Sequence, residues 1–198
     1  MATLIRSLAV ATVMAMLALP AMAQSATAPD RLGIPGPITF DDKAFVLSWS
    51  SQPSTTYFKQ EYLPAGQTGN TYTEMFLVEA LLGNVRPIDS AGAQVKMIQQ
   101  RQQTDKVANF SILQNEQTGE VLLDFVLSDL QANPIIVEWN AYRYVPLEGA
   151  EGVALYAISR RGYGEDGAKA LLQGLGAIRD SHMQELGSSD LPPVKVAP

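Results

Sequence analysis

The stretch 119–186 constrains the fold of this chain most strongly, because it predicts three consecutive strands followed by a helix. Segment 119–128 (GEVLLDFVLS) alternates apolar and polar residues, whereas 134–145 (PIIVEWNAYRYV) and 152–160 (GVALYAISR) are rich in β-branched and aromatic residues. These patterns are typical of strands, and the short turns between them favour an antiparallel meander. Apolar residues then recur at helical spacing up to Leu186, so we expect a helix covering one face of the sheet.

The upstream half of the chain is expected to extend the same sheet. Strands are predicted at 44–49, 55–63, 72–82 and 107–114, the first two joined by a turn at 51–54. The segment 72–82 also contains helix formers, and its assignment as a strand depends on the short apolar run 75–78. A helix is predicted from an N-cap at Asp89 to about Asp105. The sequence therefore predicts a single α+β domain, an antiparallel sheet with two main helices packed on it.

Both ends of the chain are expected to lie outside this domain. Residues 1–23 combine a positive charge at Arg6, an apolar run and a small-residue cleavage site ending at Ala23. This is the pattern of a secretory signal peptide. The other predicted boundaries are a flexible linker at 24–37, the α+β domain at 38–186 and a disordered tail at 187–198.

Charge and cysteine content narrow the compartment and the partners. Without residues 1–23 the chain has 13 basic and 20 acidic residues, a net charge of −7 and no basic run, which argues against a nucleic-acid partner. The absence of cysteine excludes disulfides and a lipid-attachment cysteine. No stretch after the signal peptide is long and apolar enough for a transmembrane segment. We therefore expect a periplasmic or secreted protein, soluble after cleavage near Ala23.

One segment supports a resemblance to a known fold. Residues 57–78 (YFKQEYLPAGQTGNTYTEMFLV) read as a strand, a Pro-Ala-Gly loop and a second strand. With the order of the other elements, over roughly residues 40–186, the chain resembles the Mog1p/PsbP-like fold, which includes the DcrB-type exported bacterial proteins. The resemblance implies an accessory, assembly or binding role and transfers no catalytic motif. Many DcrB-like proteins are lipid-anchored, and this chain departs from them because it lacks cysteine.

Three patterns that could carry chemistry each lack a required element. Residues 162–167 (GYGEDG) match G-x-G-x-x-G, but Glu165 and Asp166 would repel a pyrophosphate, and no strand follows the helix. Residues 180–182 (DSH) contain the residue types of a triad, but neighbours on a helix point in different directions. With one histidine and no cysteine, a zinc site would need several carboxylates as ligands. We predict no catalytic residue, no metal and no cofactor.

Aromatic and charged residues on the predicted strand 134–145 are the candidate binding residues. Trp139 and Arg143 share one face, and Tyr142 and Tyr144 share the other. Arg160 on the next strand completes the set. Trp, Tyr and Arg are enriched at binding hot spots. The alternative is that the aromatic rings pack under helices while cross-strand ion pairs face water. We expect Trp139 to be buried and Arg143 to lie at an exposed edge.

The leading functional hypothesis is an exported, non-catalytic envelope protein, acting as a binding, assembly or adaptor module for a protein partner. The oligomeric state stays open. One alternative is a carboxylate-based hydrolase of envelope sugars or lipids that uses acids such as Asp124 and Glu138. Glycoside chemistry would require two such groups about 5–10 Å apart across a cleft. Another alternative is an inhibitor-like protein that binds through an exposed loop such as 64–70.

Overall fold

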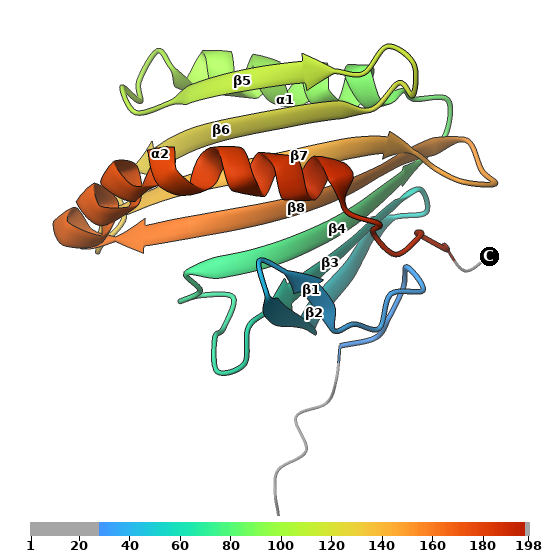
Figure 1. The fold of residues 1–198 in the computed structure, drawn as a ribbon, viewed down its shortest axis with the longest axis horizontal. Coiled ribbons are helices and arrows are strands. Elements are labelled where there is room, and N and C mark those ends of the chain that lie inside the picture. The colour runs from blue at the N-terminus through green and yellow to red at the C-terminus, as the bar shows by residue number, and fades with distance from the viewer. Residues whose placement is uncertain (1–27, 197–198) are drawn as a thin grey trace, which may run out of the picture.

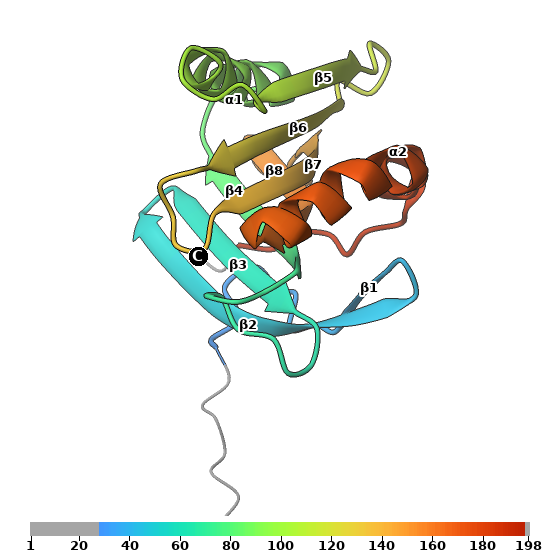
Figure 2. The same cartoon turned by 90° about the vertical axis from the view of Figure 1, so that its left-hand side faces the viewer.

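The computed structural model describes residues 28–196, in which an eight-stranded sheet lies between two helices (Figures 1 and 2). The strand order is β1-β2-β3-β4-β8-β7-β6-β5, and every neighbouring pair is antiparallel. The strands are β1 Ile38–Phe40, β2 Lys43–Ser54, β3 Tyr57–Leu63, β4 Glu74–Leu82, β5 Asn109–Gln114, β6 Val121–Asp129, β7 Ile136–Pro146 and β8 Gly152–Tyr163. The helices are α1 Pro87–Arg101 and α2 Gly164–Ser188. The predicted α+β domain with an antiparallel sheet and two helices is confirmed.

The strand predictions hold, with one displaced turn. Segment 72–82 forms the central strand β4, whose neighbours are β3 and β8, and its burial explains the short apolar run. The turn expected at 51–54 is wrong, because β2 continues to Ser54 and the chain reverses at 55–56. Along this part of β2 no strand of the described residues 28–196 pairs on the outer side, since β1 pairs only with residues 43–45. Such an edge tolerates the serines and Pro53 that suggested a turn.

Helix α1 begins and ends earlier than predicted. Its N-cap is Arg86, and Asp89 lies at the third helical position, where its carboxylate accepts a hydrogen bond from the Arg86 side chain at 2.8 Å. Pro87 at the first helical position explains the earlier start. At the other end Asp105 lies beyond the helix, because its carboxylate accepts hydrogen bonds from the backbone N–H and the hydroxyl of Ser128, each at 2.6 Å. The apolar residues of α1 pack against the sheet.

Helix α2 continues past its predicted end at Leu186. Gly187 lies inside the helix, and Ser189 is the C-cap. A Cβ at Gly187 would lie 3.0 Å from a methyl carbon of Leu122 on β6, so this glycine permits close approach to the sheet. The G-x-G-x-x-G pattern has a similar explanation. A Cβ at Gly162 would lie 2.3 Å from the carbonyl oxygen of Gly167, so the two glycines let the strand and the helix meet at their junction.

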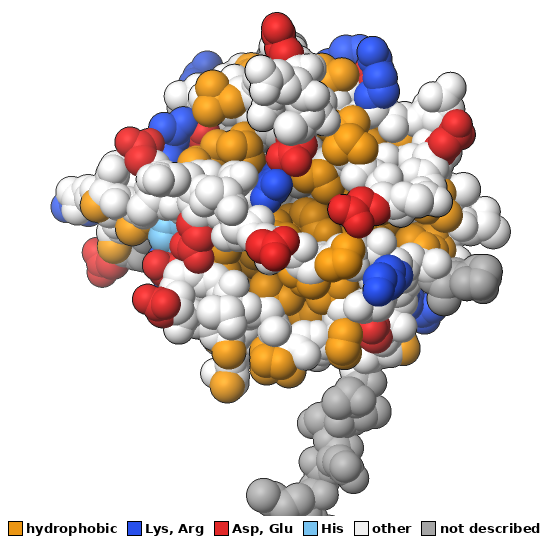
Figure 3. Space-filling view, turned by 45° about the vertical axis from the view of Figure 1, so that its right-hand side comes forward, with side chains coloured by type: hydrophobic (Ala, Val, Ile, Leu, Met, Phe, Trp, Pro, Cys, Tyr) orange, Lys and Arg blue, Asp and Glu red, His pale blue; other side chains and the backbone are white. Residues whose placement is uncertain are grey.

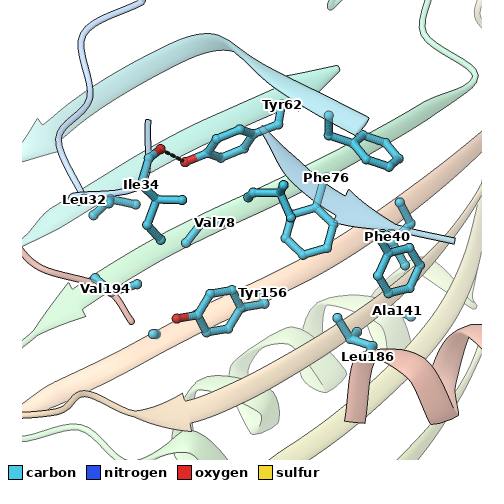
Figure 4. Packing of buried hydrophobic residues seen from close by; sticks show 14 of the residues in the cluster. Leu32, Ile34, Phe40, Tyr62, Phe76, Val78, Ala141, Tyr156, Leu186 and Val194 are labelled. Carbon is cyan, nitrogen blue, oxygen red and sulfur yellow. Dashed lines mark hydrogen bonds between the residues drawn. The ribbon is translucent and has the colours of Figure 1, made fainter. Parts of the chain in front are cut away.

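The two faces of the sheet have separate cores. On the face covered by α2, which we call the closed face, the apolar core includes Phe40, Phe76 and Leu186 (Figure 4). Trp139 belongs to the same core. On the face covered by α1, which we call the open face, the core includes Ala91 and Ile98 of the helix together with buried residues of β6, β7 and β8. The alternation of side chains along each strand therefore feeds two cores at once.

Both segments next to the predicted domain pack on the closed face, which differs from the expected linker and disordered tail. In the first segment Leu32 and Ile34 are buried, and in the second Val194 is buried (Figure 4). The Lys195 N–H donates to the Leu32 carbonyl at 2.7 Å, which joins the two segments. Helix α2 leaves part of the closed face uncovered. The apolar residues of the two terminal segments are buried on this part, although prolines and polar residues separate them in the sequence. The predicted signal peptide, 1–23, lies outside the described residues.

Within residues 28–196, neither α1 nor α2 is long and apolar enough to cross a bilayer.

Candidate functional site

The five predicted binding residues do not form one site, because they belong to the two different faces of the sheet. Trp139 is 1% exposed beneath α2, as expected, and its indole N–H donates to an Asp124 carboxylate oxygen at 3.3 Å. Arg179 of α2 pairs with the same carboxylate at 2.6 Å. Trp139 is therefore part of the closed-face core, where no partner can contact it in the folded protein.

Arg143 stabilises the end of α2. The prediction of an exposed edge is wrong, because the side chain is 15% exposed. Its guanidinium pairs with Glu120 and donates to the carbonyl oxygens of Leu186 and Ser189 at 3.1 and 3.0 Å. The last carbonyls of a helix lack intrahelical partners, and an arginine satisfies them here. A cavity of about 330 Å³ opens beside Arg143 and is bordered by the C-terminal segment; Figure 3 shows the apolar hollow between charged side chains on this side.

Arg160 belongs to a cluster of charges around the single histidine. It pairs with Asp41 at 2.9 Å and with Glu74 at 3.0 Å. His182 is 2% exposed, with Nδ1 2.7 Å from the Ile178 carbonyl and Nε2 2.7 Å from the Arg160 guanidinium. Because a carbonyl oxygen can only accept and a guanidinium can only donate, Nδ1 donates to Ile178 and Nε2 accepts a hydrogen bond from Arg160, so both ring nitrogens have partners. Burial acts to raise the pKa of Asp41, but the surrounding positive charges lower it below its usual value.

The two acids considered for hydrolysis cannot act together. Asp124 faces α2 and is held by Trp139 and Arg179. Glu138 lies on the open face, where it accepts hydrogen bonds from Arg161 and from the Tyr72 hydroxyl. The sheet separates the two carboxylates, so they do not flank a common cleft.

Tyr142 and Tyr144 line a cavity on the open face, between α1 and the sheet. The cavity has a volume of about 390 Å³. We call it the tyrosine groove, and define it by Tyr57, Glu79, Tyr142 and Tyr144 of the sheet and Ser90 and Met97 of α1. The cross-strand register explains the convergence, because Glu79 pairs with Leu155 and Leu155 pairs with Tyr144. Beyond Met97 a second hollow of about 560 Å³ continues towards Glu138 and Arg161.

Glu79 dominates the electrostatics of the tyrosine groove. Its burial raises the pKa of the carboxyl group above the usual value, although the Tyr57 hydroxyl and the Lys59 ammonium act in the opposite direction. Lys59 lies 3.8 Å from Glu79 and 3.3 Å from Glu61. Burial likewise raises the pKa of Tyr144 above its usual value, so its ring is neutral at physiological pH. The groove thus combines neutral phenols with one partly desolvated carboxylate.

The sequence prediction found the two tyrosines of β7 but missed Glu79, Ser90 and Met97. Glu79 is a charged residue inside the apolar strand β4, and that interruption was the available signal. Ser90 and Met97 lie on a helix whose position against the sheet is a tertiary feature. The exposed loop 64–70 is ordered by the Gln67 side chain, which accepts a hydrogen bond from the Thr73 N–H at 2.7 Å.

No metal centre is found in the described part of the chain. Between residues 28 and 196, no three histidine or acidic side chains are grouped so that they could hold a metal ion. The tyrosine groove is lined by aromatic, hydroxyl and carboxylate groups.

Comparison with protein families gives one match. Residues 32–191, most of the chain, match the model of a protein family whose description names no function, and the chain belongs to this family. Comparisons with curated proteins and with solved structures find no match.

Proposed function

We propose that this chain is an exported, non-catalytic binding module of the cell envelope, and that the tyrosine groove is its binding site. The observation that carries the proposal is the convergence of three tyrosines and Glu79 in one cavity of about 390 Å³. Small-molecule sites in proteins have volumes of roughly 300–1,000 Å³ and combine apolar walls with a few polar groups. Here Leu81, Val153 and Leu155 supply the apolar walls.

A binding role is favoured over catalysis by the arrangement of the reactive groups. Both nitrogens of His182 are engaged, and Asp124 and Glu138 lie on opposite faces. The pattern of residues 1–23 supports export to the periplasm or the medium. The order of the elements supports a Mog1p/PsbP-like relationship, in which an accessory or assembly role with an envelope protein would be expected.

Photo-crosslinking in cells tests this proposal. A benzoylphenylalanine would replace Met97, which borders the groove and is 47% exposed. The matched control places the same residue at Leu172 on α2, which is 41% exposed on the other side of the sheet. We expect covalent adducts at position 97 and none at position 172, measured by intact-mass spectrometry of the purified full-length product. The same spectra should give a mature N-terminus within two residues of Gln24.

Equal adduct formation at the two positions, or none at position 97, would contradict a binding site in the tyrosine groove. A mass that includes Met1 in the envelope fraction would contradict cleavage of the signal peptide. These two results are independent, so the export and the binding parts of the proposal can fail separately.

A further inference from the structure

The tyrosine groove is polarised towards cations. Of the described residues that line it, Glu79 is the one with a charged side chain. An anionic ligand would meet this carboxylate in a partly desolvated site, which is strongly unfavourable. A cationic ligand would instead supply a counter-charge to a carboxylate that is 19% exposed. The charge of the lining therefore selects the sign of the ligand charge.

The tyrosine rings also favour a cationic ligand. The rings of Tyr142 and Tyr144 meet at 64°, with their centroids 6.0 Å apart, so they form a corner rather than a stack. Tyr57 lies across the groove from this corner, beside Glu79. Aromatic faces attract ammonium groups, and the attraction is stronger in desolvated sites. Two inclined rings and a carboxylate together resemble the geometry in which proteins hold ammonium ions.

Helix α1 supplies an acceptor without a partner. The Ser90 hydroxyl oxygen is buried and makes no hydrogen bond to any described residue, and Ser90 lines the groove. Buried polar atoms are normally paired, and an unpaired one indicates a missing ligand or water. A hydroxyl oxygen can accept a hydrogen bond from an N–H donor. This observation is independent of the charge of Glu79, and the hydroxyl provides a hydrogen-bonding group for a polar ligand without setting the sign of its charge.

Lys59 provides a cation that the ligand can replace. Its ammonium is 3.8 Å from Glu79 and 3.3 Å from Glu61, so it is shared between two carboxylates. When a ligand takes over Glu79, Lys59 keeps Glu61 as its partner and no charge is left unpaired. Replacement of Lys59 by the ligand at Glu79 therefore avoids the large free-energy cost of leaving a partly buried charge without a partner.

We infer that the tyrosine groove binds an organic ammonium group with an apolar body, held by the Glu79 carboxylate, the Tyr142–Tyr144 corner and the Ser90 hydroxyl. This inference rests on the proposed function and specifies its ligand. The ammonium can belong to a free amine or to a lysine side chain of a protein partner. The apolar walls formed by Leu81, Val153 and Leu155 would contact the carbon chain in either case.

Calorimetric titration of the mature protein with matched probes tests the inference. The probes are n-hexylammonium, hexanoate, n-hexanol and the peptide acetyl-Gly-Lys-Gly-amide. We expect n-hexylammonium to bind and hexanoate not to bind. If the lysine peptide binds more tightly than n-hexylammonium, the natural ammonium group belongs to a protein lysine. If n-hexylammonium binds more tightly, it belongs to a free amine. Glu79→Gln should weaken n-hexylammonium at least roughly tenfold, because it removes a charge-assisted hydrogen bond. Lys59→Met should tighten it, because it removes the competing cation.

The opposite signs of these two substitutions separate ligand contact from a general change in stability. Glu165→Gln is the control, since Glu165 is an exposed acid in the first turn of α2 and should leave the affinity unchanged. The ammonium group would bind the ionised carboxylate of Glu79, and burial raises the pKa of this group. The affinity for n-hexylammonium should therefore fall as the pH is lowered and Glu79 becomes protonated.

Three results would overturn the ammonium assignment. These are equal binding of n-hexylammonium and n-hexanol, equal binding of hexanoate, or an unchanged affinity in Glu79→Gln. If neutral or anionic probes bind and crosslinks still form at Met97, the groove remains the binding site and only the ligand class is wrong. If no probe binds and no crosslink forms, the proposed function fails as well.

Discussion

The two faces of the sheet differ in how completely they are covered. On the closed face α2, with 25 residues, acts together with residues 28–37 and 189–196, and the large side chains of Trp139, Tyr62 and Phe76 are fully buried. On the open face α1 has 15 residues, and within residues 28–196 no terminal segment packs beside it, so the tyrosine groove remains next to the helix. A short helix cannot cover a sheet of this width, and the uncovered part carries the tyrosine groove.

This difference teaches that the same alternating strand can serve two purposes. On β7, Trp139 packs into the closed core, and Tyr142 and Tyr144 face the groove. Aromatic residues on one strand thus have different energetic roles, set by what covers each face. Substitutions on the closed face should change stability, whereas substitutions in the groove should mainly change binding.

The largest effect is expected for Trp139→Ala on the closed face. Removing a fully buried indole leaves a cavity in the closed-face core, so the free energy of unfolding should fall by roughly 3–5 kcal/mol. Urea denaturation of the mature protein measures it. Tyr144→Phe on the open face keeps the ring and removes only the hydroxyl, so it should change stability by less than about 1 kcal/mol. A loss below about 1 kcal/mol for Trp139→Ala would contradict its role in the closed-face core.

Removal of residues 191–198 should have the next largest effect. The deletion takes away the buried Val194 side chain, the Lys195 N–H donor to Leu32 and the Pro192 carbonyl that accepts from Tyr156. We expect a loss of roughly 2–4 kcal/mol in the free energy of unfolding. The control is Lys195→Ala, which keeps the segment and its backbone hydrogen bond. A truncated protein as stable as the full chain would mean that this segment does not cover the closed face.

The smallest effect concerns the pH dependence of stability, where the two faces should differ in sign. On the closed face the pKa of Asp41 is lowered in the folded state, so its ionised form stabilises the fold above its unfolded pKa, and this contribution is lost as the pH falls. On the open face the pKa of Glu79 is raised, so the fold gains stability as the pH falls through that value.

Unfolding curves of Asp41→Asn and Glu79→Gln between pH 7 and pH 3 would measure the two contributions. The stability advantage of the wild type over Asp41→Asn should shrink towards low pH. The free energy of unfolding of the wild type should be lowest relative to that of Glu79→Gln at pH 7. This difference in stability should disappear at low pH, where Glu79 is protonated. Parallel pH profiles for the two variants would contradict the electrostatic contrast between the faces.

Several features of the candidate site could be predicted from single residues, and others could not. The alternation along 134–145 places Trp139 opposite Tyr142 and Tyr144, and the structure confirms this. The role of Arg143 could not be predicted, because its partners Glu120, Leu186 and Ser189 are 23 to 46 residues away in the chain. The continuation of α2 past its predicted end at Leu186 could not be predicted either, because the close approach of Gly187 to Leu122 is a contact between distant segments.

The sequence by itself determined the types of the elements, the two-faced character of the strands and the absence of disulfides. These properties depend on composition and on residues that are near neighbours in the chain. The tertiary structure alone decided that β4 pairs with β8, that the terminal segments cover the closed face and that Glu79 lies beside three tyrosines. Such features depend on contacts between distant segments, whose burial and charge pairing arise only when the whole sheet is assembled.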